Sequence, residues 1–346
     1  MEKLVVGVIG LAMGAMHLKG AIEGGAEIAL ICDTNPEKLK KVGDEQGIPE
    51  ERRTENWLDI VNNKEINTVI IATPDQQHRE QIEALLEAGK NIMCEKPLAL
   101  TREDINAIVK AVSSHPECKF MIGQICRFTP SFVKAKELIE AGRLGELYYV
   151  ESEYAHDYLH LYEENPGNWR QDPIRHGVVG GGCHAVDLLR WLVGENPSEV
   201  FAYGTHKLLT EHISYDDATL SIMKFPGNVM GKVFVSTGCK RSYTMRTCIY
   251  GTKGTIIMDN TSPTLDFYEA DENGHVASSN PQVIDVSVNN HNAIREFASF
   301  QDSLLNGTPI TMTVEEGAKT VAACLAIVES SERGGAIVYP DYDFTK

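Results

Sequence analysis

Between Val5 and Ile122 the sequence alternates short apolar runs with amphipathic stretches, and this alternation constrains the fold more than any other feature. The apolar runs are rich in β-branched residues and show no polar alternation, which is typical of parallel strands buried on both faces. We expect strands at Val5–Ile9, Ile28–Cys32, Val69–Ala72, Ile92–Cys94 and Phe120–Ile122, and helices at Gly14–Glu23, Pro36–Gln46, His78–Glu87 and Arg102–Ser113. Such an order predicts a parallel sheet wrapped by helices. Thr101 is the expected N-cap of the last of these helices.

After Phe128 the rhythm changes to that of an α+β domain. A helix is expected at Ser131–Ala141, then mostly strands from Leu147 to about Ile284, then two long helices at Asn290–Leu305 and Val314–Arg333. A chain of 346 residues exceeds the ~250–300 residues of a single core. We therefore predict an α/β protein with two domains. Residues 1–125 form a Rossmann dinucleotide-binding domain, and residues 126–346 form an α+β domain with a largely antiparallel open sheet, for substrate binding and oligomerisation.

The composition argues against several classes of function. The formal net charge of −17 disfavours nucleic-acid binding, which needs clustered Lys and Arg. No apolar run approaches the ~18–20 residues of a membrane span, and no secretory signal follows Lys3. The eight cysteines form no C-x-x-C pair, so neither a zinc site nor a disulfide framework is indicated. We expect a cytoplasmic protein with reduced thiols, no metal site, and no nucleic-acid or membrane partner.

The stretch VVGVIGLAMGAMHL passes from a strand through glycines into a helix, as a turn that binds a pyrophosphate does. Gly10, Ala12 and Gly14 occupy this turn, with alanine in place of the usual second glycine. Asp33 ends the next strand 23 residues after Gly10, near the ~20 expected for a carboxylate that binds the adenosine ribose. The alternative is a turn or capping Asp. We expect NAD rather than NADP, because no basic residue adjoins Asp33 in CDTNPE.

Two further motifs predict catalysis. In NIMCEKPLAL a buried strand runs into Glu95 and Lys96 at the carboxyl end of the sheet, where open α/β folds bind ligands. Burial would lower the pKa of Lys96 from ~10.4 towards the range useful for proton transfer, although a surface lysine is the alternative. In GGGCHAVDLLRWLVG a flexible lead-in precedes a helix that places His184 and Asp187 on one face. The alternative is a core histidine bonded to a backbone carbonyl.

The segment Glu153–His176 is dense in aromatic, imidazole and guanidinium groups. Carbohydrate sites combine aromatic faces with planar polar groups, because a pyranose presents apolar C–H faces and a rim of hydroxyls. A polar surface loop would have a similar composition. The residues expected to contact substrate are Tyr154, His156, Trp169, Arg170 and His176.

Over essentially its whole length the chain resembles the Gfo/Idh/MocA family of oxidoreductases, which includes inositol dehydrogenases, glucose–fructose oxidoreductase and many sugar dehydrogenases. The resemblance rests on the glycine turn, Asp33, VIIATPDQQH, the EKP of Glu95–Pro97, Arg127–Phe128, and H-x-x-D at His184–Asp187. It implies that Lys96 is the catalytic lysine, that His184 is the active-site histidine, and that the open sheet packs in homo-oligomers. It also implies that NAD is bound by Gly10, Ala12, Met13, Asp33, Thr73, Pro74, His78, Glu95 and Lys96.

Two features depart from the family pattern. Many members carry an Asp four residues before the histidine, and Gly180 stands there in this chain. The glycine turn is also one residue shorter than G-x-G-x-x-G. The first departure concerns the proton-transfer partner, and the second concerns the geometry at the pyrophosphate.

The sequence thus predicts an NAD-dependent dehydrogenase that acts on a secondary ring hydroxyl of a sugar, glycoside or cyclitol. Lys96 would polarise or deprotonate the hydroxyl, relayed through His184, and Asp187 would orient His184 or bind a neighbouring hydroxyl. One alternative is a redox-assisted glycosidase that recycles its NAD. A non-catalytic sugar-binding regulator is another, which intact Lys96 and His184 disfavour.

Overall fold

The computed structural model describes residues 4–289 and 291–345, which form two compact units. Unit 1 contains the chain up to Gln124, residues 292–318 and the C-terminal segment from Asp343. Unit 2 contains residues 125–291 and 319–342. The units divide near residue 125, whereas the predicted second domain takes in all of residues 126–346. Two segments beyond residue 291 pack with unit 1 instead.

Unit 1 is built on a six-stranded parallel sheet with the strand order β3-β2-β1-β4-β5-β6. Its strands are β1 (Val5–Ile9), β2 (Glu27–Cys32), β3 (Arg53–Thr54), β4 (Thr68–Ile71), β5 (Asn91–Glu95) and β6 (Phe120–Gly123). Every residue of β4 and β6 is buried, as expected for a parallel sheet covered on both faces. The order reverses between β1 and β4, so a crevice for a dinucleotide is expected outside the carboxyl ends of these strands.

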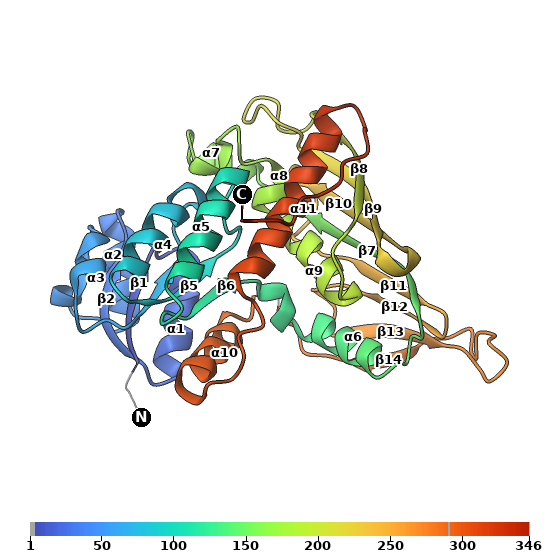
Figure 1. The fold of residues 1–346 in the computed structure, drawn as a ribbon, viewed down its shortest axis with the longest axis horizontal. Helices are drawn as coiled ribbons and strands as arrows, with labels where there is room; N and C mark the ends of the chain where they lie inside the picture. Colours follow the sequence, from blue (N-terminus) through green and yellow to red (C-terminus); the bar gives the residue numbers. More distant parts are fainter. Residues whose placement is uncertain (1–3, 290, 346) are drawn as a thin grey trace. The chain divides into compact units, whose positions relative to one another are not determined.

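The helices of unit 1 are α1 (Gly14–Glu23), α2 (Pro36–Glu45), α3 (Leu58–Asn62), α4 (His78–Glu87), α5 (Arg102–Ser114) and α10 (Ala293–Asn306). Thr101 caps α5 as predicted, because its Oγ1 accepts from the backbone N–H of Asp104 and donates to the Asp104 carboxylate. Figure 1 shows α10 beside α1, where Gly20 permits the close approach. A methyl group on Gly20 would lie 3.0 Å from the Cα of Ile294.

Unit 2 is built on an eight-stranded sheet with the order β14-β13-β12-β11-β7-β10-β9-β8. All its neighbouring strands are antiparallel except β7 and β10, so the predicted α/β fold with a largely antiparallel second sheet is confirmed. The strands are β7 (Leu147–Ala155), β8 (Glu199–Thr205), β9 (Ala218–Phe225), β10 (Val229–Ser236), β11 (Thr247–Gly251), β12 (Gly254–Met258), β13 (Thr264–Glu269) and β14 (Gln282–Asp285).

The helices of the second half are α6 (Pro130–Glu140), α7 (Leu159–Glu164), α8 (Gly177–Gly180), α9 (Cys183–Val193) and α11 (Val314–Glu332). Helix α9 packs on β7 and β10 and buries one face of the sheet. Along β9, residues alternate between buried and exposed, which places Leu220 and Ile222 on the open face. Within the part of the chain that is described, no helix is long and apolar enough to cross a membrane.

The predicted helix at Asn290–Leu305 starts at Ala293, and residue 290 lies outside the described residues. The glycine-rich lead-in before His184 is buried, with Gly180 at the end of α8 and Gly181 and Gly182 in the turn before α9. A methyl group on Gly182 would lie 2.5 Å from Val235, and one on Gly181 would lie 2.6 Å from the Tyr154 ring. These glycines therefore serve close packing.

Candidate active site

The glycine turn follows β1 and leads into α1. Gly10 has a φ of +85°, and a methyl group there would lie 2.4 Å from the carbonyl oxygen of Ala72, so both conformation and space require glycine. A methyl group on Gly14 would likewise be tight, at 3.2 Å from the Cβ of Ala72. Ala12 and Met13, between them, are exposed or half-buried. The turn thus leaves its tip accessible at the start of α1, an arrangement that fits a pyrophosphate.

Asp33 supports this turn directly. Its carboxylate accepts from the backbone N–H of Leu11 at 2.8 Å and from that of Asn35 at 2.9 Å. The side chain of Lys38, in the first turn of α2, lies 3.2 Å from the same carboxylate. The sequence shows no basic residue adjoining Asp33, but the helix brings Lys38 back onto it. A cation therefore stands beside the carboxylate that was predicted to select NAD.

The loop after β4 carries Thr73 and Pro74, both half-buried. His78 was predicted to bind the cofactor, but its side chain is fully buried. Its Nδ1 lies 3.0 Å from the carbonyl oxygen of Pro97, and its Nε2 lies 3.2 Å from that of Thr73. The structure thus gives His78 a supporting position, in which it joins the loop after β4 to the loop after β5.

Lys96 follows β5 on a backbone that is held from two sides. The Glu95 carboxylate accepts from the backbone N–H of Lys96 at 3.1 Å, and the next carbonyl, that of Pro97, is bonded to His78. The Lys96–Pro97 peptide bond is cis, and Lys96 is half-buried. Since the strands are parallel, Lys96 lies at the same edge of the sheet as Gly10 and Asp33.

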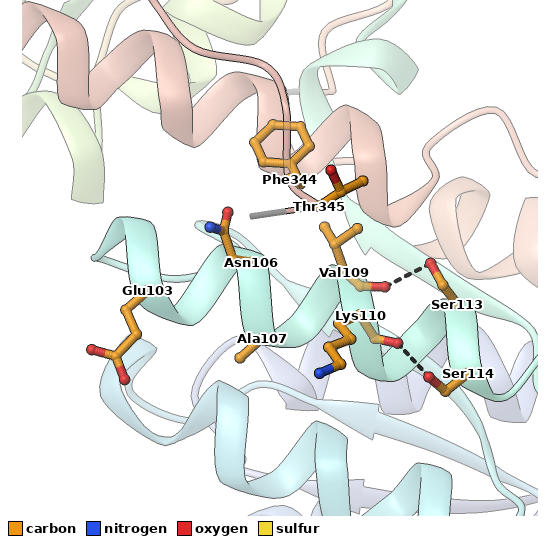
Figure 2. A pocket seen from close by; sticks show the side chains of 9 residues that line it. All are labelled: Glu103, Asn106, Ala107, Val109, Lys110, Ser113, Ser114, Phe344 and Thr345. Atoms are coloured by element: carbon orange, nitrogen blue, oxygen red, sulfur yellow. Dashed lines mark hydrogen bonds between the residues drawn. The ribbon is translucent and has the colours of Figure 1, made fainter.

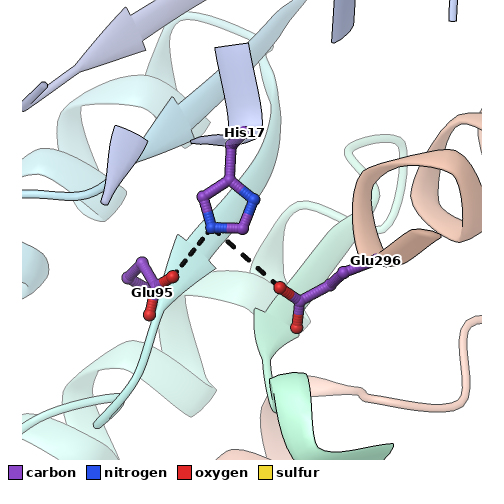
Figure 3. A group of neighbouring side chains, drawn as sticks. All are labelled: His17, Glu95 and Glu296. Carbon is purple, nitrogen blue, oxygen red and sulfur yellow. Dashed lines mark hydrogen bonds and ion pairs between the residues drawn. The ribbon is translucent and has the colours of Figure 1, made fainter. Parts of the chain in front are cut away.

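Behind this loop lies a buried cluster that the sequence did not predict, formed by His17 on α1, Glu95 on β5 and Glu296 on α10 (Figure 3). The Nε2 of His17 lies 2.7 Å from Glu95 Oε1 and 4.0 Å from Glu296 Oε2. Burial acts to raise the pKa of Glu95, but the hydrogen bond and charge of His17, with the charge of Lys96, outweigh it and lower that pKa. Burial and the charge of Glu95 raise the pKa of Glu296 well above its usual range.

In unit 2, aromatic and imidazole rings gather around the end of β7. The Tyr154 hydroxyl lies 2.7 Å from that of Tyr158 and 3.2 Å from Nδ1 of His156. The ring of Tyr154 stacks on His184 with 6.1 Å between centroids. Tyr243 contacts Tyr154 and His156 and stacks on His291. Burial raises the pKa of the Tyr154 and Tyr243 phenols well above the usual value, so both remain neutral hydrogen-bonding groups.

His184 lies beside a thiol. The Sγ of Cys126 lies 3.6 Å from Nδ1 of His184 and 3.5 Å from the sulfur of Met245, and all three side chains are buried. Gly180 stands at the position of the family Asp. The guanidinium of Arg175 occupies the space beside it, because a methyl group on Gly180 would lie 2.2 Å from that guanidinium.

Asp187 does not orient His184, in contrast to the prediction. Its carboxylate accepts two hydrogen bonds from Arg127, at 2.9 and 2.6 Å, and one from Thr320 at 3.1 Å. Arg190 lies 3.6 Å away, and Asp187 is fully buried. The spacing of three residues places Asp187 near His184 along α9. A buried carboxylate is stable only when it is paired, however, and the cation that pairs with Asp187 is Arg127. Asp187 therefore forms an internal ion pair rather than a substrate contact.

The remaining predicted substrate residues form a second group. The guanidinium groups of Arg170 and Arg175 lie 4.2 and 4.6 Å from the centre of the Trp169 ring. The ring of His176 packs against Tyr215, and its Nε2 lies 3.8 Å from Glu332. Burial lowers the pKa of His176 against the opposing charges of Glu332 and Asp216. His176 thus lies with Tyr215, whereas Tyr154 and His156 lie with His184.

A groove of about 570 Å³ in unit 1 lies away from all these residues. It is bounded by one face of α5 and by Phe344 and Thr345 of the C-terminal segment (Figure 2). None of the predicted site residues lines it. The candidate residues therefore fall into two groups, one at the carboxyl edge of the first sheet in unit 1 and one in the ring cluster of unit 2.

Comparison with known proteins finds similarity in both halves of the chain. Residues 4–124 match an oxidoreductase family with an NAD-binding Rossmann fold, and residues 132–257 match the GFO/IDH/MocA C-terminal domain. The chain is 26% identical to inositol 2-dehydrogenase 2 of Saccharopolyspora erythraea over 276 residues, which is 79% of this chain and 78% of that protein. It is 28% identical to levoglucosan dehydrogenase of Pseudarthrobacter phenanthrenivorans over 257 residues, 66% of this chain and 64% of that protein.

The fold is also similar to that of solved structures. A levoglucosan dehydrogenase in complex with NADH and levoglucosan has a TM-score of 0.86 at 24% identity, covering 99% of this chain and 100% of that one. The predicted NAD-binding Rossmann domain is thus confirmed.

The pair formed by Asp33 and Lys38 generates a prediction about cofactor choice. Asp33→Ala removes the carboxylate and leaves the cation, so affinity for NADP relative to NAD should rise by at least about tenfold. Lys38→Ala removes the cation, so its affinity for NADP should be lower than that of the wild type. Calorimetric titration of both cofactors measures the two ratios. Equal shifts in both variants would contradict a role for Asp33 in selecting NAD.

Proposed function

Because the chain belongs to the GFO/IDH/MocA family of oxidoreductases, we propose that it oxidises a secondary ring hydroxyl of a sugar, glycoside or cyclitol with NAD. The observation that carries the proposal is the placement of Lys96 on a backbone held by Glu95 and His78, at the sheet edge that also bears Gly10 and Asp33. An acid–base group fixed at the cofactor edge is what alcohol oxidation requires.

In the proposed mechanism Lys96 polarises the reacting hydroxyl and takes up its proton. A bound NAD would supply the hydride acceptor for this oxidation. His184 serves the same reaction as a group that can exchange a proton with substrate, and its Nδ1 lies 3.6 Å from the Cys126 thiol. Gly10, Ala12 and Met13 would hold the pyrophosphate and Asp33 would bind the ribose, while Thr73 and Pro74 lie on the neighbouring loop.

The ring cluster supports a polyhydroxylated ring as substrate. Tyr154, His156 and Tyr243 offer aromatic faces for C–H groups together with hydroxyl and imidazole groups for the rim of hydroxyls. Relatives named for inositol and for levoglucosan act on cyclic polyols of this kind. We extend the proposal to glycosides oxidised at a ring carbon such as C3.

A screen of sugars, glycosides and inositols, followed by NADH absorbance and by mass spectrometry of the products, tests the function. Net NADH with a ketone product supports the dehydrogenase. Release of an aglycone without net NADH points instead to a redox-assisted glycosidase. If no member of the panel gave any product, that result would contradict the proposal.

On the best substrate of that screen, Lys96→Met should reduce turnover by roughly 10²–10⁴, the usual contribution of an acid–base group. The substitution keeps the apolar stem and removes the ammonium, so NAD should still bind. Lys110→Met, an exposed position on α5, is the matched control and should retain turnover. A Lys96→Met enzyme with wild-type turnover would show that proton transfer depends on another residue.

The Trp169 group generates a prediction about substrate binding. Trp169→Ala removes the ring on which Arg170 and Arg175 rest, and should raise the Michaelis constant for the sugar or lower its turnover. NAD binding should change by less than about 1 kcal/mol, as for distant sites. Trp191→Ala on α9, where Lys136 lies over the ring, is the control. Loss of NAD affinity in folded Trp169→Ala protein would refute this division of roles.

The open face of the second sheet supports a homo-oligomer. Tyr203, Leu220, Ile222 and Met230 on β8, β9 and β10 are each 45–58% exposed, and Tyr203 pairs with Leu220. An apolar face of this kind on a single chain marks an interface, and a second copy supplies the same apolar surface.

Ile222→Glu should therefore reduce the assembly to monomers in light scattering. Leu58→Glu, at an exposed leucine of unit 1, should leave the assembly unchanged. A wild-type protein that is itself monomeric at micromolar concentration would contradict the proposed interface.

The proposal also covers location and partners. All eight cysteines carry free thiols, which suits the reducing cytoplasm. We propose a cytoplasmic enzyme whose partners are a small carbohydrate or cyclitol and further copies of itself, with no nucleic-acid or membrane partner.

A further inference from the structure

The cluster of His17, Glu95 and Glu296, here called the His17 triad, has an unbalanced set of hydrogen bonds (Figure 3). Each carboxylate oxygen of Glu95 accepts one bond, from His17 Nε2 at 2.7 Å and from the Lys96 backbone N–H at 3.1 Å. Among the described residues, neither oxygen of Glu296 has a hydrogen-bond partner, although the side chain is 0% exposed. His17 Nε2 lies 4.0 Å from Glu296 Oε2 and bonds to Glu95 instead.

Charge balance distinguishes the possible states of the triad. The titratable or charged groups that face Glu296 are His17 from α1 and Glu95 and Lys96 at the end of β5, and Gly123 of β6 lies beside it. With both carboxyls ionised, two negative charges would be buried, and the Glu296 carboxylate would have no hydrogen-bond donor in the part of the chain that is described, since neither His17 nor Lys96 donates to it. An isolated buried carboxylate without donors is costly enough that such groups bind a proton instead.

A bound metal ion would be another way to neutralise two carboxylates, and the geometry argues against it. Ligands at ~2.0–2.1 Å around a tetrahedral ion lie about 3.3 Å from one another. The 2.7 Å between His17 Nε2 and Glu95 Oε1 is instead the length of a charge-assisted hydrogen bond. A proton therefore fits the triad better than an ion.

We propose that Glu296 carries a proton at neutral pH and acts as a positioning residue for Lys96. With Glu296 neutral, the single negative charge of the triad stays on Glu95, where it is held between the ring of His17 and the backbone N–H of Lys96. The role of the protonated acid is thus to keep this anchor of the Lys96 backbone intact. The part that concerns Lys96 rests on the proposed function, whereas the protonation of Glu296 does not.

Infrared difference spectroscopy of the full-length protein tests the proton without any substrate. At about pH 7 the wild type should show the carbonyl stretch of a buried carboxylic acid, and Glu296→Gln should lack it. Glu315→Gln, at an exposed position at the start of α11, should retain the band. A wild-type spectrum without this band overturns the proposal. So does one equivalent of tightly bound metal that Glu296→Gln loses, measured by elemental analysis.

Thermal unfolding against pH gives a second, independent readout. The pKa of Glu296 is raised in the folded state, so the folded state binds more protons than the unfolded state above about pH 4.3. Wild-type stability should therefore fall with rising pH through this window. Glu296→Gln removes the group, so its melting temperature should exceed that of wild type at neutral pH, with the difference vanishing near pH 4. An identical pH dependence in both proteins overturns the proposal.

The link to Lys96 is tested at His17. His17→Leu removes the donor to Glu95 and should lower turnover by at least about tenfold, with NAD affinity within about threefold of wild type. His17→Gln offers an amide N–H at similar reach and should restore part of the turnover. Wild-type turnover in folded His17→Leu, or no difference between the two variants, overturns the positioning role. Absence of wild-type activity on every substrate would instead count against the proposed function.

Discussion

The carboxylate of Glu95 is the group on which the arrangement of the first unit depends. It is buried at the end of a parallel strand, so water cannot solvate it and its partners must come from the protein. His17 supplies one from the helix that follows the glycine turn, and the backbone of Lys96 supplies the other. The helix that begins beside the cofactor turn and the loop that carries the proposed acid–base residue are therefore fixed to each other through one side chain.

The strands and helices of the first unit could be predicted because their signals are local. Parallel strands buried on both faces have continuous apolar sequences. The Thr101 cap can be recognised from Thr101 and Asp104, which are only three residues apart. The membership of α10 in this unit could not be predicted in the same way. It depends on the close approach of α10 to Gly20 and on Glu296, which are contacts between segments far apart in sequence.

In the candidate site, too, features set by local sequence could be predicted and features set by long-range contacts could not. The turn at Gly10 and the position of Asp33 follow from spacing, whereas Lys38 reaches Asp33 only through the first turn of a helix. Asp187 has the right spacing from His184, yet Arg127 and Thr320 determine its partner. Cys126, Tyr243 and His291 belong to no motif, and only the fold brings them to His184 and its neighbours. In the sequence, only their residue types, a thiol, a phenol and an imidazole, indicate that they could belong to a site.

The path of the chain through the two units has a consequence for its synthesis. The described part of unit 1 starts at Leu4 but is completed only by residues 292–318 and 343–345, and α11 passes from one unit to the other at Ala318. Domains usually fold in the order in which they leave the ribosome. Here the face of α1 that α10 covers stays uncovered until most of the second unit has been translated. The nascent chain must therefore remain soluble with its first unit incomplete.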